Sequence, residues 1–277
     1  MVVLSELFHS PQDSMADLSR SPTSSWTAHE LIAYNIAIIT QTPQEFFHQN
    51  AEPSLEHIHP ALINAVTDFD PDVPVNISEY ISHLLLAIKG GQEGFFVGFS
   101  RETLNVLGFT ESDGVLISRY TIPLTICGKA NRSVKMDVCL LDPQLMILLV
   151  VRGAKNKSPM QAEPQVIKAA IAAYQHNNKM RQNRGLPILD AMTIPCITMV
   201  ALQPTFYLVP VTQALNMAVV AGQYPETPIN VTKCVTGLGH DHQITENMVT
   251  PEYRRVAFQH VIAFKGLARE YWRTFLV

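Results

Sequence analysis

The feature that most constrains this chain is a pair of short apolar runs joined by an Asp-Pro turn. The first run, residues 134–141, contains a single acid, Asp137, and the second, residues 146–151, leads towards Lys155. Runs of this length and composition on either side of a turn signal predict two adjacent β-strands. The position two residues before the lysine would share its strand face, and Gly153 occupies it.

Composition bounds the class of protein. The 277 residues allow one large domain or two small ones, and 47% are hydrophobic, which is enough for a packed core. The net charge is -4, which argues against a protein that coats nucleic acid without specificity, because that binding needs clustered Lys and Arg. The net charge does not exclude a local basic groove.

No run is long and apolar enough for a transmembrane helix, and the N-terminus has no basic start typical of a secretory signal. The four cysteines lack metal-type spacing, which favours reduced, buried thiols. We therefore expect an intracellular protein, in the cytoplasm or nucleus, with no membrane partner. The oligomeric state is left open by the sequence.

Three segments are expected along the chain: a flexible N-terminal segment (1–28), a helical N-terminal extension (29–90) and a main domain (91–277). The helical expectation for the extension includes residues 30–40, and a helix start is expected at Thr42-Pro43. Further helices are predicted from the period of their apolar residues, at 77–88, 93–107, 164–180, 213–221 and from residue 251 onward.

Between these helices the pattern is that of strands. Strands are expected at 115–118, 119–127, 134–141, 146–151, 196–202 and 205–211. Gln203-Pro204 is interpreted as the turn between the last two strands, and residues 223–249 as irregular. The order predicts an α/β (α+β) fold with a mixed sheet flanked by helices.

A strand, a strand with Asp137, a strand leading to Lys155 and then a helix resemble the core of the PD-(D/E)XK, or restriction-endonuclease-like, superfamily. The chain resembles more closely a group of nuclease-like proteins of mushroom-forming fungi, over roughly residues 90–275. The stretches that carry this resemblance are 102–109, 120–128, 136–142, 146–151, 163–175 and 193–199.

The resemblance implies a Mg²⁺-dependent hydrolysis of DNA or RNA phosphodiesters, in which two acids bind the cation and a lysine positions water. It implies that Asp137 is the strand acid and a metal ligand, and that Lys155 is the catalytic lysine. Glu102 matches the helix acid, with Glu93 as a weaker candidate, and Gln165 matches a helix glutamine found in some branches.

The chain departs from this pattern at one position. The related fungal sequences resemble Gln-Glu-Asp-Lys where this chain has Arg152-Gly153-Ala154-Lys155, so the second acid is replaced by Gly153. Arg152 would add positive charge near the cation and oppose metal binding. Glu163, at the start of the following helix, is an alternative source of the missing carboxylate.

Three functions remain open. The first is a catalytically impaired nuclease-like protein, the second an active Mg²⁺-dependent nuclease that uses Glu102 or Glu163, and the third an interaction module on the same fold. Basic residues could line a nucleic-acid backbone, although a charged helix face is the common alternative. These are Lys155, Lys157, Lys168, Lys179, Arg181 and Arg184.

Overall fold

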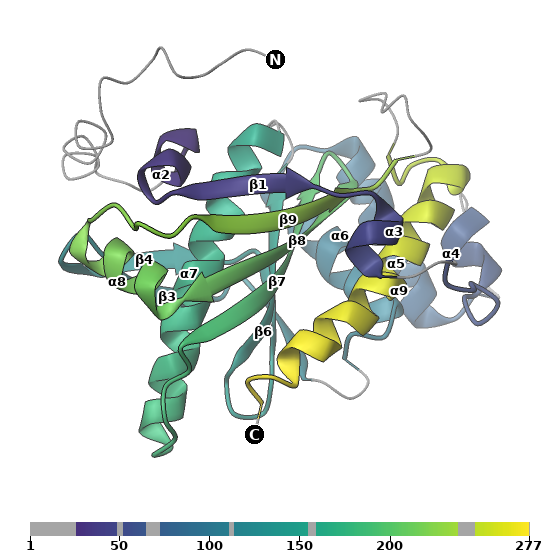
Figure 1. Ribbon diagram of the computed structural model, residues 1–277. Coiled ribbons are helices and arrows are strands. Elements are labelled where there is room, and N and C mark those ends of the chain that lie inside the picture. The colour runs from purple at the N-terminus through teal and green to yellow at the C-terminus, as the bar shows by residue number, and fades with distance from the viewer. Residues whose placement is uncertain are drawn as a thin grey trace, which may run out of the picture.

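The computed structural model describes residues 26–48, 52–64, 73–110, 114–154, 159–237 and 247–276. Within these ranges the chain forms a seven-stranded mixed sheet with helices on both faces (Figure 1). The strand order is β1-β9-β8-β7-β6-β5-β2. The strands are β1 (Ile36–Thr40), β2 (Val115–Ser118), β5 (Val138–Leu141), β6 (Ile147–Ala154), β7 (Ala191–Val200), β8 (Gln203–Thr212) and β9 (Ile229–Val235). The expected mixed sheet with flanking helices is confirmed.

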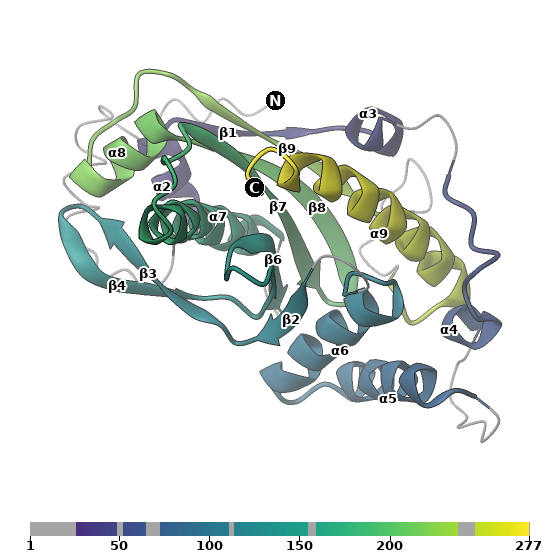
Figure 2. The same cartoon turned by 90° about the horizontal axis from the view of Figure 1, so that it is seen from below.

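The two faces of the sheet carry different elements, as Figure 2 shows. One face is covered by α7 (Pro159–Asn183), α8 (Gln213–Ala221), α2 (Ala28–Ala33) and a separate two-stranded sheet of β3 (Thr121–Ile126) and β4 (Lys129–Lys135). The other is covered by α6 (Glu93–Val106) and α9 (Pro251–Trp272), with α3 (Pro43–Phe47), α4 (Pro60–Asn64) and α5 (Val75–Lys89) packed beside them. Among the described helices, none has both the length and the apolarity needed to cross a bilayer.

Strand directions follow from the connections. β5 runs antiparallel to both β2 and β6, and β6 runs parallel to β7. Parallel neighbours need a crossover, and α7 provides it. β7 and β8 form a hairpin whose turn residues, Ala201 and Leu202, have φ of 47° and 67°. Two residues with positive φ are typical of a type I′ hairpin turn.

The expected turn at Gln203-Pro204 is therefore wrong by two residues. Gln203 and Pro204 already pair with β7, opposite Val200 and Met199. Proline is tolerated here because it lies at the start of the strand, where its missing N–H costs least.

Two other segments differ from expectation. Residues 30–40 are not one helix, because α2 ends at Ala33 and Asn35 takes a left-handed φ of 52°. The β-branched run that follows forms β1, which pairs in parallel with β9. Residues 223–249 are not irregular throughout, since 229–235 form β9. β9 pairs with β8, the strand that precedes it in the chain, and β1 completes this edge of the sheet from the N-terminal end of the described chain.

Of the expected flexible segment 1–28, residues 1–25 lie outside the described part of the chain. The last three residues are ordered against the fold. Trp26 is buried and stacks on Tyr34 with 5.4 Å between ring centroids. Thr27 caps α2 in a reciprocal capping box with Glu30, as its backbone N–H and hydroxyl both donate to Glu30 Oε2 at 2.6 and 2.7 Å.

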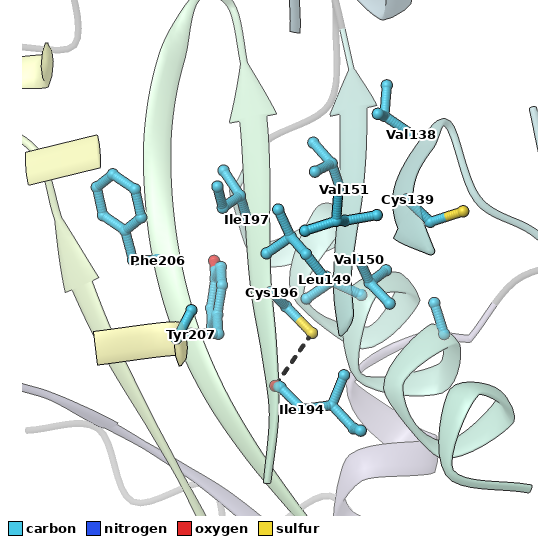
Figure 3. Packing of buried hydrophobic residues seen from close by; sticks show 14 of the residues in the cluster. Val138, Cys139, Leu149, Val150, Val151, Ile194, Cys196, Ile197, Phe206 and Tyr207 are labelled. Atoms are coloured by element: carbon cyan, nitrogen blue, oxygen red, sulfur yellow. Dashed lines mark hydrogen bonds between the residues drawn. The ribbon is translucent and has the colours of Figure 1, made fainter. Parts of the chain in front are cut away.

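The core lies between the central strands and the helices on each side. Figure 3 shows buried side chains of β6, β7 and β8, with the Cys196 thiol donating to the Ile194 carbonyl at 3.4 Å. On the α9 face, Phe206 packs against Phe264 and the Trp272 indole N–H donates to the Leu148 carbonyl at 2.6 Å. Close packing of this kind restricts the side chains that line the sheet.

Candidate functional site

Asp137 sits in the two-residue break between β4 and β5, and its side chain extends the sheet. The carboxylate is 2% exposed, and its Oδ2 accepts the Gly153 N–H at 2.8 Å. Its own carbonyl accepts the Arg119 N–H at 2.8 Å. Because β5 pairs with β6 from Val138 onward, the carboxylate takes the place of a backbone acceptor one step beyond the ladder.

Arg152 supplies the charge that faces this carboxylate. Its Nη1 lies 3.5 Å from Asp137 Oδ1 and also donates to the Lys135 carbonyl. Arg152 lies opposite Thr198 of β7 in the parallel register. The sequence-based expectation that Arg152 would bring positive charge to Asp137 agrees with this geometry. Asp137, Arg152 and Gly153 are hereafter the Asp137 cluster.

A side chain at position 153 would point towards α6. A Cβ at this position would lie 3.9 Å from Phe96 Cβ and from Ser100 Oγ, which is ordinary van der Waals distance. A side chain at 153 thus finds room at its first carbon. Its φ lies outside the left-handed region, so no backbone conformation requires glycine here.

Glu102 does not share that position. It follows Ser100 by two residues, which turns it by about 200° around the helix. Its Oε1 receives Arg101 Nη1 at 2.7 Å and its Oε2 receives Asn105 Nδ2 at 3.1 Å. The structure therefore brings Ser100, and not Glu102, to Gly153. Glu93, the weaker candidate, is exposed at the start of α6.

Glu163 belongs to a second cluster on the α7 face. Its Oε1 lies 2.5 Å from Lys233 Nζ and accepts the Tyr207 hydroxyl at 3.4 Å. The Thr198 hydroxyl donates in turn to the Tyr207 oxygen at 3.4 Å. Burial raises the pKa of Tyr207, with the Glu163 charge adding to the effect. Glu163, Lys233, Tyr207 and Thr198 are hereafter the Glu163 cluster.

The Glu163 cluster lies beside the Asp137 cluster. Its Thr198 is on β7, directly opposite Arg152 of β6, whereas Lys233 is on β9, three strands from β6. The Glu163 carboxylate is engaged by Lys233, so it is not free to act as the second acid beside Asp137. Both clusters lie near the carboxyl ends of the parallel strands β6 and β7, where α/β sheets place ligand sites.

The remaining sequence-predicted residues have these positions. Gln165 donates from Nε2 to the Trp26 carbonyl at 2.5 Å, which ties α7 to the start of α2. Lys155 and Lys157 lie outside the described residues, so the predicted role of Lys155 stays a prediction. The expected basic helix face holds only in part, because Lys179 and Arg184 are exposed while Lys168 and Arg181 are buried. Arg181 donates to the Pro187 and Phe275 carbonyls, which is a structural role.

A resident Mg²⁺ does not fit the side chains that the structure describes. The described ranges contain no group of three or more His, Cys, Asp or Glu side chains that could hold a metal ion. The Asp137 carboxylate accepts the Gly153 N–H through one oxygen and has the Arg152 guanidinium 3.5 Å from the other, and that positive charge would repel a cation. Metal ligation by Asp137 and Glu102 stays a prediction without support from this geometry.

Sequence reasoning missed Lys233 and Tyr207, and it named Lys168 as a basic residue of a helix face without predicting that it is buried. Lys233 and Tyr207 occupy strand positions that alone indicate only a half-buried sheet, and the segment of Lys233 was interpreted as irregular. No protein-family model matches this chain, and no curated protein matches it significantly.

Proposed function

We propose that the protein is a nuclease-like member of the PD-(D/E)XK type that has lost metal-dependent hydrolysis, and that binds phosphate-containing ligands without cleaving them. The element order supports the proposal: α6, β2, the β3–β4 hairpin, β5 and β6, then α7 and β7, with β5 antiparallel to β2 and β6 and with β7 parallel to β6. Asp137 directly precedes β5 and Lys155 directly follows β6 in the sequence, so the order resembles the one on which the family resemblance rests.

The observation that carries the loss of hydrolysis is the state of the Asp137 carboxylate. One oxygen accepts the Gly153 N–H and the other faces Arg152. A cation at this carboxylate would have to compete with a guanidinium at 3.5 Å, and like charges at that range repel. Asp137 then acts as a strand cap that is neutralised by Arg152, and no other acid in the described ranges replaces the one missing at 153.

The test restores the missing acid. Wild type, Gly153→Glu, Gly153→Gln and Asp137→Ala are compared for Mn²⁺ binding by calorimetry and for cleavage of DNA and RNA with Mg²⁺ or Mn²⁺. We expect no metal-dependent cleavage by wild type. Metal binding should rise in Gly153→Glu and not in Gly153→Gln, which has the same size without the charge.

Cleavage by wild type that disappears in Asp137→Ala would overturn the proposal and favour an active Mg²⁺-dependent nuclease. The same activity in wild type and Asp137→Ala would point to another site or to contamination. The third hypothesis, an interaction module, predicts that the protein binds neither DNA nor RNA, even at low salt, where binding to the nucleic-acid backbone is strongest.

A further inference from the structure

Lys168 is a buried cation that belongs to neither the Asp137 cluster nor the Glu163 cluster. It lies on α7 and is 5% exposed. In the described ranges no hydrogen bond or ion pair engages its ammonium group, although burying an unpaired charge is costly. In the described ranges, four buried polar atoms have neither a hydrogen-bond partner nor contact with solvent: Trp26 Nε1, Tyr80 OH, His83 Nδ1 and Asp142 Oδ2. Lys168 Nζ is not among them, so it keeps some contact with solvent.

The helix orients Lys168 towards the β3–β4 hairpin. Gln175, seven residues later, lies on the same helix face because seven residues make almost two full turns. Gln175 Oε1 accepts the Thr125 N–H at 2.9 Å, and its Nε2 donates to the Thr125 carbonyl at 3.1 Å. The face of α7 that carries Lys168 is thus the face that packs on the hairpin.

Two arginines come to the same place from two other elements. Arg132 pairs with Leu124 across the hairpin, and both Leu124 and Val134 are buried, so this face of the hairpin meets α7. Arg152 enters from β6. Burial lowers the pKa of Lys168, and the charges of Arg152 and Arg132 lower it further, so both arginines lie within electrostatic range of Lys168.

Among the described residues, two acids face this group, and both have other partners. Glu30 raises the pKa of Lys168 but is bound through Oε2 by Thr27. Asp137 lies against Arg152 and accepts the Gly153 N–H. Within the part of the chain that the structure describes, three cations against two acids leave one positive charge in excess, together with unused N–H donors on Lys168.

We propose that Arg132, Arg152 and Lys168 form a binding site for one phosphate group. Arginine and lysine donors from three separate elements can surround the phosphate oxygens, and an anion would relieve the unpaired charge of Lys168. The ligand is either free phosphate, a phosphomonoester, or one diester group of a nucleic-acid backbone. This site deepens the proposed function and rests on its ligand-binding part, because it names the residues that would hold the phosphate. It requires neither a metal nor the residue at 153, so it is independent of the loss of hydrolysis.

The test uses calorimetric titration at low salt with two probes, inorganic phosphate and a short single-stranded DNA oligonucleotide. Lys168→Met is compared with Lys179→Met, which removes an exposed lysine from the same helix. We expect wild type and Lys179→Met to bind alike. Lys168→Met should bind roughly tenfold more weakly, the loss typical of one charge-assisted hydrogen bond.

Binding of phosphate alone supports a small phosphorylated ligand, and tighter binding of the oligonucleotide supports a polymer backbone. No binding of either probe by wild type, or equal binding by Lys168→Met, overturns the site. Folding of Lys168→Met is checked by thermal unfolding, and Arg132→Met provides a second variant that must also weaken binding. Failure of the Gly153→Glu experiment leaves these outcomes unchanged, so the two proposals fail separately.

Discussion

Replacing Asp137 tests whether its carboxylate stabilises the sheet or serves as a metal ligand. If the side chain caps the β5–β6 ladder, then Asp137→Ala removes the acceptor of the Gly153 N–H and the charge facing Arg152. An unpaired buried N–H costs about 1–3 kcal/mol. The Arg152 side chain is 20% exposed, so its lost ion pair adds at most about 1 kcal/mol. We expect Asp137→Ala to lower the free energy of unfolding by about 2–3 kcal/mol.

Asp137→Asn is the matched variant. The Asn carbonyl still accepts the Gly153 N–H, so only the interaction with Arg152 weakens. The expected loss is about 1 kcal/mol. Urea unfolding of wild type and both variants, without added metal, gives the three free energies. Hydrogen exchange of the Gly153 amide reports the capped bond directly, and it should accelerate in Asp137→Ala and stay slow in Asp137→Asn.

The reasoning is refuted if Asp137→Ala is as stable as wild type. A carboxylate that can be deleted from the sheet at no cost is not a cap, and it would be free for metal. A gain in stability for both variants would have the same meaning, because electrostatic strain at a functional site is released when its charge is removed.

Three further predictions address the rest of the described fold. Burial lowers the pKa of His260 from 6.5 to about 4. The contribution of neutral His260 to the free energy of unfolding is therefore complete above pH 6.5. As the pH falls from 6.5 towards 4, that contribution decreases by about 1.4 kcal/mol per pH unit, to a total loss of about 3 kcal/mol. The difference between wild type and His260→Gln in urea unfolding from pH 7 to 4 should follow that slope, and parallel pH profiles would contradict it. Gln175→Ala should cost about 2 kcal/mol and speed exchange of the Thr125 amide, because two backbone groups lose their partner. Glu163→Gln and Lys233→Met should each cost about 2 kcal/mol, and the double variant less than their sum; strict additivity would show that the pair does not interact.

Local signals predicted the elements that carry their own start and stop residues. Helix α8 matches the expected 213–221, because the Thr212 hydroxyl accepts the Leu215 N–H and Gly222 ends the helix in the left-handed conformation. The Asp137 hairpin is similar: β5 and β6 lie where two apolar runs predicted adjacent strands, although a break at Asp137 divides the first run. In both cases the determining contacts are short in sequence.

The rest depends on partners that are distant along the chain. The run at 36–40 is apolar enough for a buried helix, and it is a strand only because β9 offers a free edge. The ion pair of Glu163 with Lys233 spans 70 residues. Nothing in the composition near Lys168 indicates that it turns inward to face two arginines. Pairing over such distances is set by the assembled sheet and has no signature in a window of sequence.

The pairing of β1 with β9 also has consequences for how the chain folds. Ile36 and Ile229 are register partners although nearly the whole sheet separates them in sequence. During synthesis β1 emerges early and has no strand to pair with until β9 has been made. Contacts of such long range are slow to form, because a large loop must close first. The unpaired edge of β9 is a template for intermolecular pairing until β1 occupies it. Protein that begins after Thr40 would keep that edge open permanently, so the segment at 36–40 protects the sheet from aggregation.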